Sequence, residues 1–123
     1  MKQNKKNLKV SIITINLNNK FGLKKTIKSI QTQNYKKFEN IIIDGYSNDG
    51  SLEVIKKNKK NFTKIIFKKG DGIYSAINEG LKNAKGDVIS ILHSGDKYSN
   101  KNVLNFVSKN FINSKIDVLF AST

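Results

Sequence analysis

Short runs of apolar residues alternate along the chain with segments in which apolar residues recur every three or four positions. The short runs are rich in isoleucine and valine, which is typical of buried β-strands. Ile41, Ile42 and Ile43 follow one another without a polar residue, as in a parallel strand covered on both faces. The pattern predicts five strands, at residues 9–15, 38–44, 64–67, 87–92 and 116–120.

The segments between these strands have the periodicity of amphipathic helices. In the first of them Leu23, Ile27 and Ile30 lie on one helical face. The same spacing predicts helices at residues 22–33, 51–60, 74–84 and 101–113.

Two of these helices allow a prediction about packing. Beside the face formed by Ile73, Ile77 and Leu81, the third helix has a stripe of small residues that permits close approach to a neighbour: Ala76, Gly80 and Ala84. In the fourth helix we expect Val103, Phe106 and Val107 to point inward.

Strands that alternate with helices over short connections predict right-handed crossovers and a parallel sheet with helices on both sides. The predicted fold class is therefore α/β, a Rossmann-like three-layer α/β/α sandwich with a mostly parallel sheet of about five strands. We expect a basic tail over residues 1–8 and a single domain over residues 9–123. The apolar runs are shorter than the roughly 18 residues of a membrane helix, and no signal peptide is evident. We therefore expect a cytoplasmic protein.

The charge of the chain is strongly positive. All 23 basic residues are lysine, against nine acidic residues, which gives a formal net charge of +14. One explanation is a compositional bias that places lysine on any solvated surface. The other is a partner such as an anionic membrane face, a phosphorylated ligand or nucleic acid. The lysines are dispersed and arginine, the usual reader of bases, is absent, so we expect no nucleic-acid partner.

Polar side chains follow four consecutive predicted strands. Because the carboxyl ends of parallel strands meet at one edge of a sheet, these groups are expected to converge. Carboxylates are the preferred ligands of Mg²⁺ and Mn²⁺, and the pattern favours a sugar or nucleotide site with a divalent cation. The groups are the Thr14–Asn19 segment, Asp44 and Asp49 with Ser47, Asp71 between two glycines, and His93, Ser94 and Asp96.

Each of these residues also has a structural explanation. Asp49 and Ser51 are suited to cap a helix, and Asp44, Asp71 and Asp96 to form turns. A single histidine is more often a hydrogen-bonded polar residue than a ligand. The absence of cysteine excludes a disulfide, a thiolate nucleophile and a cysteine-based zinc site. No glycine-rich dinucleotide motif and no P-loop occurs.

Three blocks of the sequence together resemble the nucleotide-sugar-binding half of a family-2 glycosyltransferase of GT-A fold. They read VSIITINLN, LKKTIKSIQTQNYKKFENIIIDGYSNDGS and GDGIYSAINEGLKNAKGDVISILHSGD, and the resemblance extends from Lys9 to about Phe120. It implies transfer of a sugar from a nucleotide sugar, UDP-linked, with inversion, during polysaccharide synthesis.

The resemblance also implies roles for individual residues. Nucleoside-binding positions correspond to Thr14, Asn18, Glu39, Asp44 and Asp49. The block GIYSAIN corresponds to the part that lies beside the diphosphate and sugar, which gives Gly72, Tyr74 and Asn78, with Asp71 next to them. HSGD corresponds to the metal-binding block, with Ser94 in the nucleotide-sugar site and Asp96 as the ligand of Mn²⁺ or Mg²⁺; Gly95 occupies the position of the first acid of the usual pair.

The acceptor implied by the resemblance is a glycan or a lipid-linked molecule, and an anionic membrane surface would be a further partner. Relatives continue beyond the fifth strand with the acceptor-binding segment and the catalytic base. We therefore expect the 123-residue chain to be inactive on its own, and to associate with itself or with a partner subunit. The alternative is a non-catalytic, degenerate transferase domain that binds a nucleotide or a partner protein.

Overall fold

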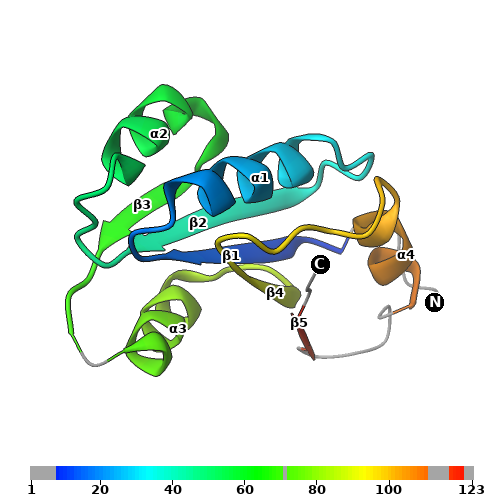
Figure 1. The fold of residues 1–123 in the computed structure, drawn as a ribbon. Helices are drawn as coiled ribbons and strands as arrows, with labels where there is room; N and C mark the ends of the chain where they lie inside the picture. Colours follow the sequence, from blue (N-terminus) through cyan, green and yellow to red (C-terminus); the bar gives the residue numbers. More distant parts are fainter. Residues whose placement is uncertain (1–7, 71, 111–116, 121–123) are drawn as a thin grey trace.

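The computed structural model describes residues 8–70, 72–110 and 117–120. The chain alternates between strands and helices throughout (Figure 1). The strands are β1 (Val10–Asn16), β2 (Phe38–Asp44), β3 (Lys64–Phe67), β4 (Val88–His93) and β5 (Asp117–Phe120). The helices are α1 (Lys20–Gln31), α2 (Ser51–Lys57), the short 3₁₀ helix η2 (Lys59–Asn61), α3 (Ile73–Asn83) and α4 (Val103–Asn110).

The strands form one parallel sheet in the order β3-β2-β1-β4-β5. The central strand β1 pairs with β2 from Val10↔Phe38 to Asn16↔Asp44, and with β4 on its other side. The polar residues that end β1, β2 and β4 consequently meet at one edge of the sheet. The predicted α/β class with a parallel sheet is confirmed.

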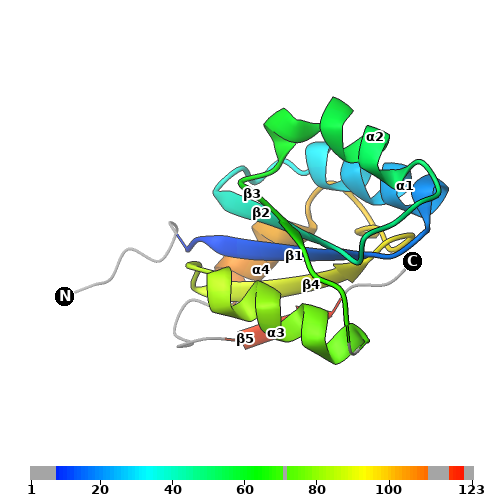
Figure 2. The same cartoon turned by 90° about the vertical axis from the view of Figure 1, so that its left-hand side faces the viewer.

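Helices cover both faces of this sheet, as Figures 1 and 2 show. On one face α1 and α2 bury Leu23, Ile27 and Val54 against β2, and α4 adds Leu104 to a neighbouring cluster. On the opposite face α3 packs against the alternate residues of β1, β2 and β4. The alternation of inward and outward side chains along each strand thus supplies two separate apolar layers.

The small-residue stripe of α3 lies against the sheet as predicted. Ala76 and Ala84 pack on the cluster beneath α3, and Gly80 is the buried residue of the helix. A Cβ atom at Gly80 would lie 2.5 Å from Cγ2 of Ile13 in β1. The absence of a side chain at Gly80 therefore sets how closely α3 approaches the strand.

The structure corrects one prediction about packing. Phe106 was expected to point inward from α4, but 66% of it is exposed, whereas Leu104 and Val107 are buried. Phe106 lies two residues after Leu104, which places it about 200° away around the helix.

The helix ends also differ from the sequence prediction. Helix α1 begins at Lys20 because the side chain of Asn19 accepts a hydrogen bond from the backbone N–H of Gly22. Helix α2 ends at Lys57, and residues 59–61 form the separate 3₁₀ turn. The predicted tail over residues 1–8 and the predicted continuation of α4 over residues 111–113 fall largely outside the described residues. Within the described parts of the chain, none of the helices has the length and apolarity needed to span a bilayer.

Candidate functional site

A cleft of about 650 Å³ lies at the edge of the sheet where the strands end. Residues that follow β1, β2, β3 and β4 line it, together with the first turn of α3. The lining consists of Ile15–Asn19, Ile43, Gly45, Tyr46, Asn48, Lys68–Gly70, Gly72, Ile73, Ala76, His93 and Ser94. This is the edge at which open α/β sheets bind their ligands.

Asp44 joins the loop after β1 to the loop after β2. It is fully buried, and its carboxylate accepts hydrogen bonds from Asn16 Nδ2 at 2.8 Å and from the backbone N–H and the hydroxyl of Ser47, each at 2.8 Å. The hydroxyl of Ser47 in turn accepts a hydrogen bond from the backbone N–H of Asn18 at 2.9 Å. Asp44 therefore fixes the two loops beside the cleft, because both of its carboxylate oxygens are bonded within the protein.

Asp49 joins the beginnings of two helices. One carboxylate oxygen accepts a hydrogen bond from the backbone N–H of Lys20 at 2.8 Å, and the other accepts from the backbone N–H and the hydroxyl of Ser51 at 3.0 and 2.6 Å. The Ser51 hydroxyl and these backbone donors hold the pKa of Asp49 below its ordinary value, against the opposing effect of burial. The structure thus gives Asp49 the capping role that the sequence left as an alternative.

The segment His93–Asp96 forms a tight corner after β4. Asp96 Oδ2 accepts a hydrogen bond from the backbone N–H of His93 at 2.9 Å, and Gly95 has a φ of 105°, a conformation that favours glycine. Helix α1 holds the corner from the other side. Thr26 Oγ1 donates to the carbonyl of Asp96 at 2.6 Å and accepts from the N–H of Gly95 at 3.0 Å, while Asn19 Nδ2 donates to the carbonyl of Ser94.

The fit of a divalent cation to this corner depends on Asp96. Among the described residues, no group of three or more histidine, aspartate or glutamate side chains is placed to bind a metal, and no described donor is hydrogen-bonded to Asp96 Oδ1. Mg²⁺ is commonly held by one or two carboxylates together with the phosphates of a substrate. The described chain therefore offers one carboxylate at this corner, that of Asp96, and no complete set of metal ligands of its own.

Three buried polar atoms near this edge have no hydrogen-bond partner within the described part of the chain. They are Thr14 Oγ1, Asn16 Oδ1 and Ser94 Oγ. Asn16 and Ser94 both line the cleft. Buried polar atoms in native proteins are nearly always paired, so these two atoms are candidates to bind a ligand.

The apolar and cationic parts of the lining were not predicted from the sequence. The ring of Tyr46 packs on that of Phe67 with centroids 5.7 Å apart, and Tyr46 has a φ of 65° and is 57% exposed. Leu17 is also largely exposed beside the cleft, and Lys68 and Lys69 add two cations. The only sequence signal for the lysines was their position directly after β3.

The predicted site residues do not all lie at the cleft. Asn18, Gly72 and Ser94 line the cleft, and Thr14, Asp44, Asp49 and Asp96 lie on the strands and loops around it. Tyr74 and Asn78 are exposed on α3 and do not line the cleft; Asp71 lies outside the described residues.

Glu39 is not brought together with the other predicted residues. It lies near the beginning of β2, at the opposite end of the sheet from the cleft, and pairs there in register with Ser11. Its carboxylate accepts hydrogen bonds from the Ser11 hydroxyl at 2.5 Å and from the backbone N–H of Lys85 at 2.6 Å. These contacts give Glu39 a structural role between β1, β2 and the segment before β4.

Comparison with known proteins identifies relatives of similar sequence. An uncharacterised glycosyltransferase of Mycobacterium tuberculosis is 36% identical over 96 residues, covering 77% of this chain and 37% of that protein. A cholesterol galactosyltransferase of Borreliella burgdorferi is 39% identical over 90 residues, covering 72% of this chain and 25% of that protein. The chain thus matches little more than a third of the length of the first relative and a quarter of the second.

Solved structures with the same fold include two that were determined with nucleotide sugars. The mannosyltransferase PcManGT from Pyrobaculum calidifontis, in complex with GDP-Man and Mn²⁺, superposes with a TM-score of 0.77 at 20% identity, covering 85% of this chain and 32% of that one. Staphylococcus aureus TarS 1–349 in complex with UDP-GlcNAc gives a TM-score of 0.77 at 22% identity, covering 85% and 31%. The model of the family described as Glycosyl transferase family 2 matches residues 11–113, which make up most of the chain. The chain therefore belongs to this family.

Proposed function

We propose that the cleft binds a nucleotide-diphosphate sugar, UDP-linked, for transfer of the sugar in glycan or polysaccharide synthesis. The observation that carries this proposal is the cleft at the carboxyl edge of the sheet, with unpaired polar atoms, an apolar wall and two lysines in one lining. Its volume is within the range of small-molecule sites. Membership of the glycosyltransferase family supports the same class of ligand.

The nucleoside would lie against the loops after β1 and β2. Tyr46 and Leu17 offer exposed apolar surface for a planar base, and Asn16 Oδ1 offers a free acceptor for a base or ribose donor. Asp44, Asp49 and Asn18 act here by fixing the loops through hydrogen bonds between them. Thr14 is fully buried in β1, close to the end of that strand.

The diphosphate would lie between Lys68, Lys69 and the beginning of α3. Helix α3 has 11 residues, and its N-cap Gly72 has no side chain to bond the N–H groups of the first turn. Unpaired N–H groups and the helix dipole favour an anion at such a helix start. The resemblance to the family assigns Asp71, Tyr74 and Asn78 to this part of the ligand; Tyr74 and Asn78 lie on α3 outside the lining of the cleft.

A divalent cation, Mn²⁺ or Mg²⁺, would be held by Asp96 together with the phosphates. When bound, it would stabilise the negative charge that develops on the leaving nucleoside diphosphate. Ser94, two residues before Asp96, would bond the ligand through its hydroxyl.

A second candidate function is nucleotide binding without transfer. Transfer with inversion requires a carboxylate base near the acceptor hydroxyl, and the described lining of the cleft includes no aspartate or glutamate. In the proposed enzyme, a glycan or lipid-linked acceptor and its base would be supplied beyond the described residues or by a partner subunit. The proposed setting is the cytoplasm, at the membrane face that carries such an acceptor.

Titration calorimetry with UDP and with GDP, each with and without Mn²⁺, tests the binding proposal. We expect UDP to bind, and Mn²⁺ to tighten binding in the wild-type chain but not in Asp96→Ala. The double variant Lys68→Gln/Lys69→Gln should weaken UDP binding at least tenfold. Its matched control is Lys59→Gln/Lys60→Gln, which removes two adjacent exposed lysines of η2 and should leave the affinity unchanged.

The outcomes separate the two candidate functions. Absence of UDP and GDP binding under all conditions would refute both. Binding combined with release of UDP from a UDP-sugar in the presence of an acceptor supports the transferase. Binding without any turnover, even after addition of a membrane fraction that supplies acceptor and partner, favours the nucleotide-binding module.

A further inference from the structure

The outer face of α1 has an unusual concentration of positive charge. Helix α1 contains Lys20, Lys24, Lys25 and Lys28 and no acidic residue. Lys24, Lys25 and Lys28 are exposed. The ion pair found among the described residues joins Lys82 to Glu79 in α3, so the described carboxylates form no ion pair with the lysines of α1.

The other helices carry less net positive charge. Helix α2 combines two lysines with Glu53, the short helix η2 has two lysines, α3 has one lysine and one glutamate, and α4 has one lysine. Helix α1, with four lysines and no acidic residue, therefore has the largest positive charge among the described helices.

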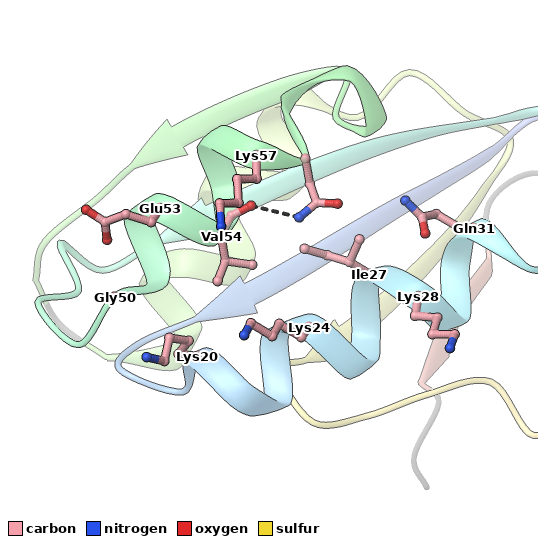
Figure 3. Close-up of a pocket in the computed structure, with 10 residues that line it drawn as sticks. Lys20, Lys24, Ile27, Lys28, Gln31, Gly50, Glu53, Val54 and Lys57 are labelled. Carbon is pink, nitrogen blue, oxygen red and sulfur yellow. Dashed lines mark hydrogen bonds between the residues drawn. The ribbon is translucent and has the colours of Figure 1, made fainter.

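A groove between α1 and α2 extends this surface. It has a volume of about 550 Å³, and Lys20, Lys24 and Lys28 line one side of it while Lys57 lines the other. Figure 3 shows the three lysines in a row along α1, with Lys57 across from them on α2. Glu53 is the one acidic residue of the lining.

An aromatic ring lies among these ammonium groups. Phe21 is 70% exposed, with Lys20 Nζ 5.0 Å and Lys24 Nζ 5.5 Å from the ring centroid. Lysines around an exposed aromatic residue are the combination found on surfaces that bind lipid headgroups, where the ring enters the boundary with the acyl chains. The apolar face of α1 is buried against the sheet, so only Phe21 would enter the lipid and binding would be reversible.

We infer that the outer face of α1 docks the chain on an anionic phospholipid membrane, with Lys24, Lys25 and Lys28 against the headgroups and Phe21 at the lipid boundary. Nucleic acid fits this surface less well. Proteins read bases chiefly with arginine, which the chain lacks, and a phosphate backbone has no apolar region to receive Phe21.

Docking in this way would place the cleft close to the membrane. The cleft residue Asn19 directly precedes α1, and the backbone of Lys20 bonds to Asp49 at the same end of the helix. A cleft at the lipid surface suits a lipid-linked acceptor. This consequence rests on the proposed function, whereas the docking itself does not.

Flotation of the full chain with vesicles tests the inference. Vesicles of phosphatidylcholine alone are compared with vesicles that also contain phosphatidylglycerol. A lysine near an anionic membrane contributes about fivefold to binding, so Lys24→Gln/Lys25→Gln/Lys28→Gln should bind the anionic vesicles roughly 100-fold more weakly. The matched control Lys85→Gln/Lys101→Gln/Lys109→Gln removes three exposed lysines outside α1 and should lose less than tenfold.

Two further measurements test the role of Phe21 and separate membrane docking from UDP binding. Phe21→Ala should weaken vesicle binding roughly tenfold without changing its dependence on salt. The α1 variants should bind UDP as the wild type does in the absence of vesicles, so that a failure of docking is distinct from a failure of the proposed function. Equal losses in the two triple variants would overturn the inference, as would binding to a duplex oligonucleotide without binding to vesicles.

Discussion

At the scale of single residues, Thr26 connects helix α1 to the corner that contains Asp96. Its side chain is fully buried, and its hydroxyl bonds at once to the carbonyl of Asp96 and to the N–H of Gly95. These two backbone groups belong to a turn whose conformation favours glycine at its centre. Thr26 therefore acts as a positioning residue for the corner, without contact to a ligand.

Replacement of Thr26 by valine should show this role. Valine keeps the shape of the side chain but leaves two backbone groups unpaired, which we expect to lower the free energy of unfolding by about 1–3 kcal/mol. Urea denaturation measures this loss, and hydrogen exchange of the Gly95 amide should become faster. The control Thr26→Ser loses a methyl group but keeps the hydroxyl, so its Gly95 amide should stay protected. Equal exchange in the two variants would show that the hydroxyl does not hold the corner.

The positions of single aspartates could be predicted from the sequence, but their hydrogen-bond partners could not. The positions of Asp44, Asp49 and Asp96 after consecutive strands followed from the pattern, and the structure brings their loops to one edge. Whether a carboxylate is free for a ligand depends on donors from distant segments, such as Asn16 for Asp44 and Lys20 for Asp49. Those donors are 28 and 29 residues away in sequence, and no local pattern signals them.

At the scale of elements, α3 reaches the sheet through small residues. Gly80 faces Ile13, which is fully buried in the central strand. Glycine in the middle of a helix costs about 1 kcal/mol relative to alanine. Its presence here is explained by the close contact rather than by helix stability.

The variant Gly80→Ala should accordingly be less stable than the wild type. At an exposed helix position, the same substitution would be expected to increase stability. The new Cβ would overlap Ile13 and push α3 outward, and overpacking of this kind costs about 1–3 kcal/mol. After the gain in helix propensity, we expect a net loss of about 1 kcal/mol by urea denaturation. Lys82→Ala, at an exposed position of the same helix, should change stability little. A stabilised Gly80→Ala would contradict the close packing.

Element positions could be predicted well because the isoleucine-rich runs and the helical spacing are strong local signals. The bounds of β2 and β3 agree with the prediction at every residue. The order of the strands and the exposure of Phe106 depend on long-range packing, which the pattern does not encode. Helix α1 begins at Lys20 rather than at the predicted residue 22, because the side chain of Asn19 caps it.

At the scale of the whole molecule, like charges repel within a compact chain of net charge +14. The described residues contain one ion pair, Lys82–Glu79, with a separation of 3.8 Å at the surface. An exposed pair of this kind contributes little to stability. Repulsion between lysines should therefore outweigh attraction between opposite charges in the folded state.

The melting temperature of the chain should thus rise with salt. The Debye length falls from about 30 Å at 0.01 M to about 3 Å at 1 M ionic strength, which removes most of the repulsion between exposed lysines. We expect a rise of about 4 °C or more in sodium chloride, since about 1 kcal/mol shifts the melting temperature by that amount in a domain of this size. Lys24→Gln/Lys25→Gln/Lys28→Gln, which removes unpaired charge from α1, should melt higher than the wild type at low salt and respond less to its addition. A melting temperature that falls with sodium chloride would mean that attractive pairs dominate, and that the lysines of α1 are neutralised within the protein rather than available to an anionic partner.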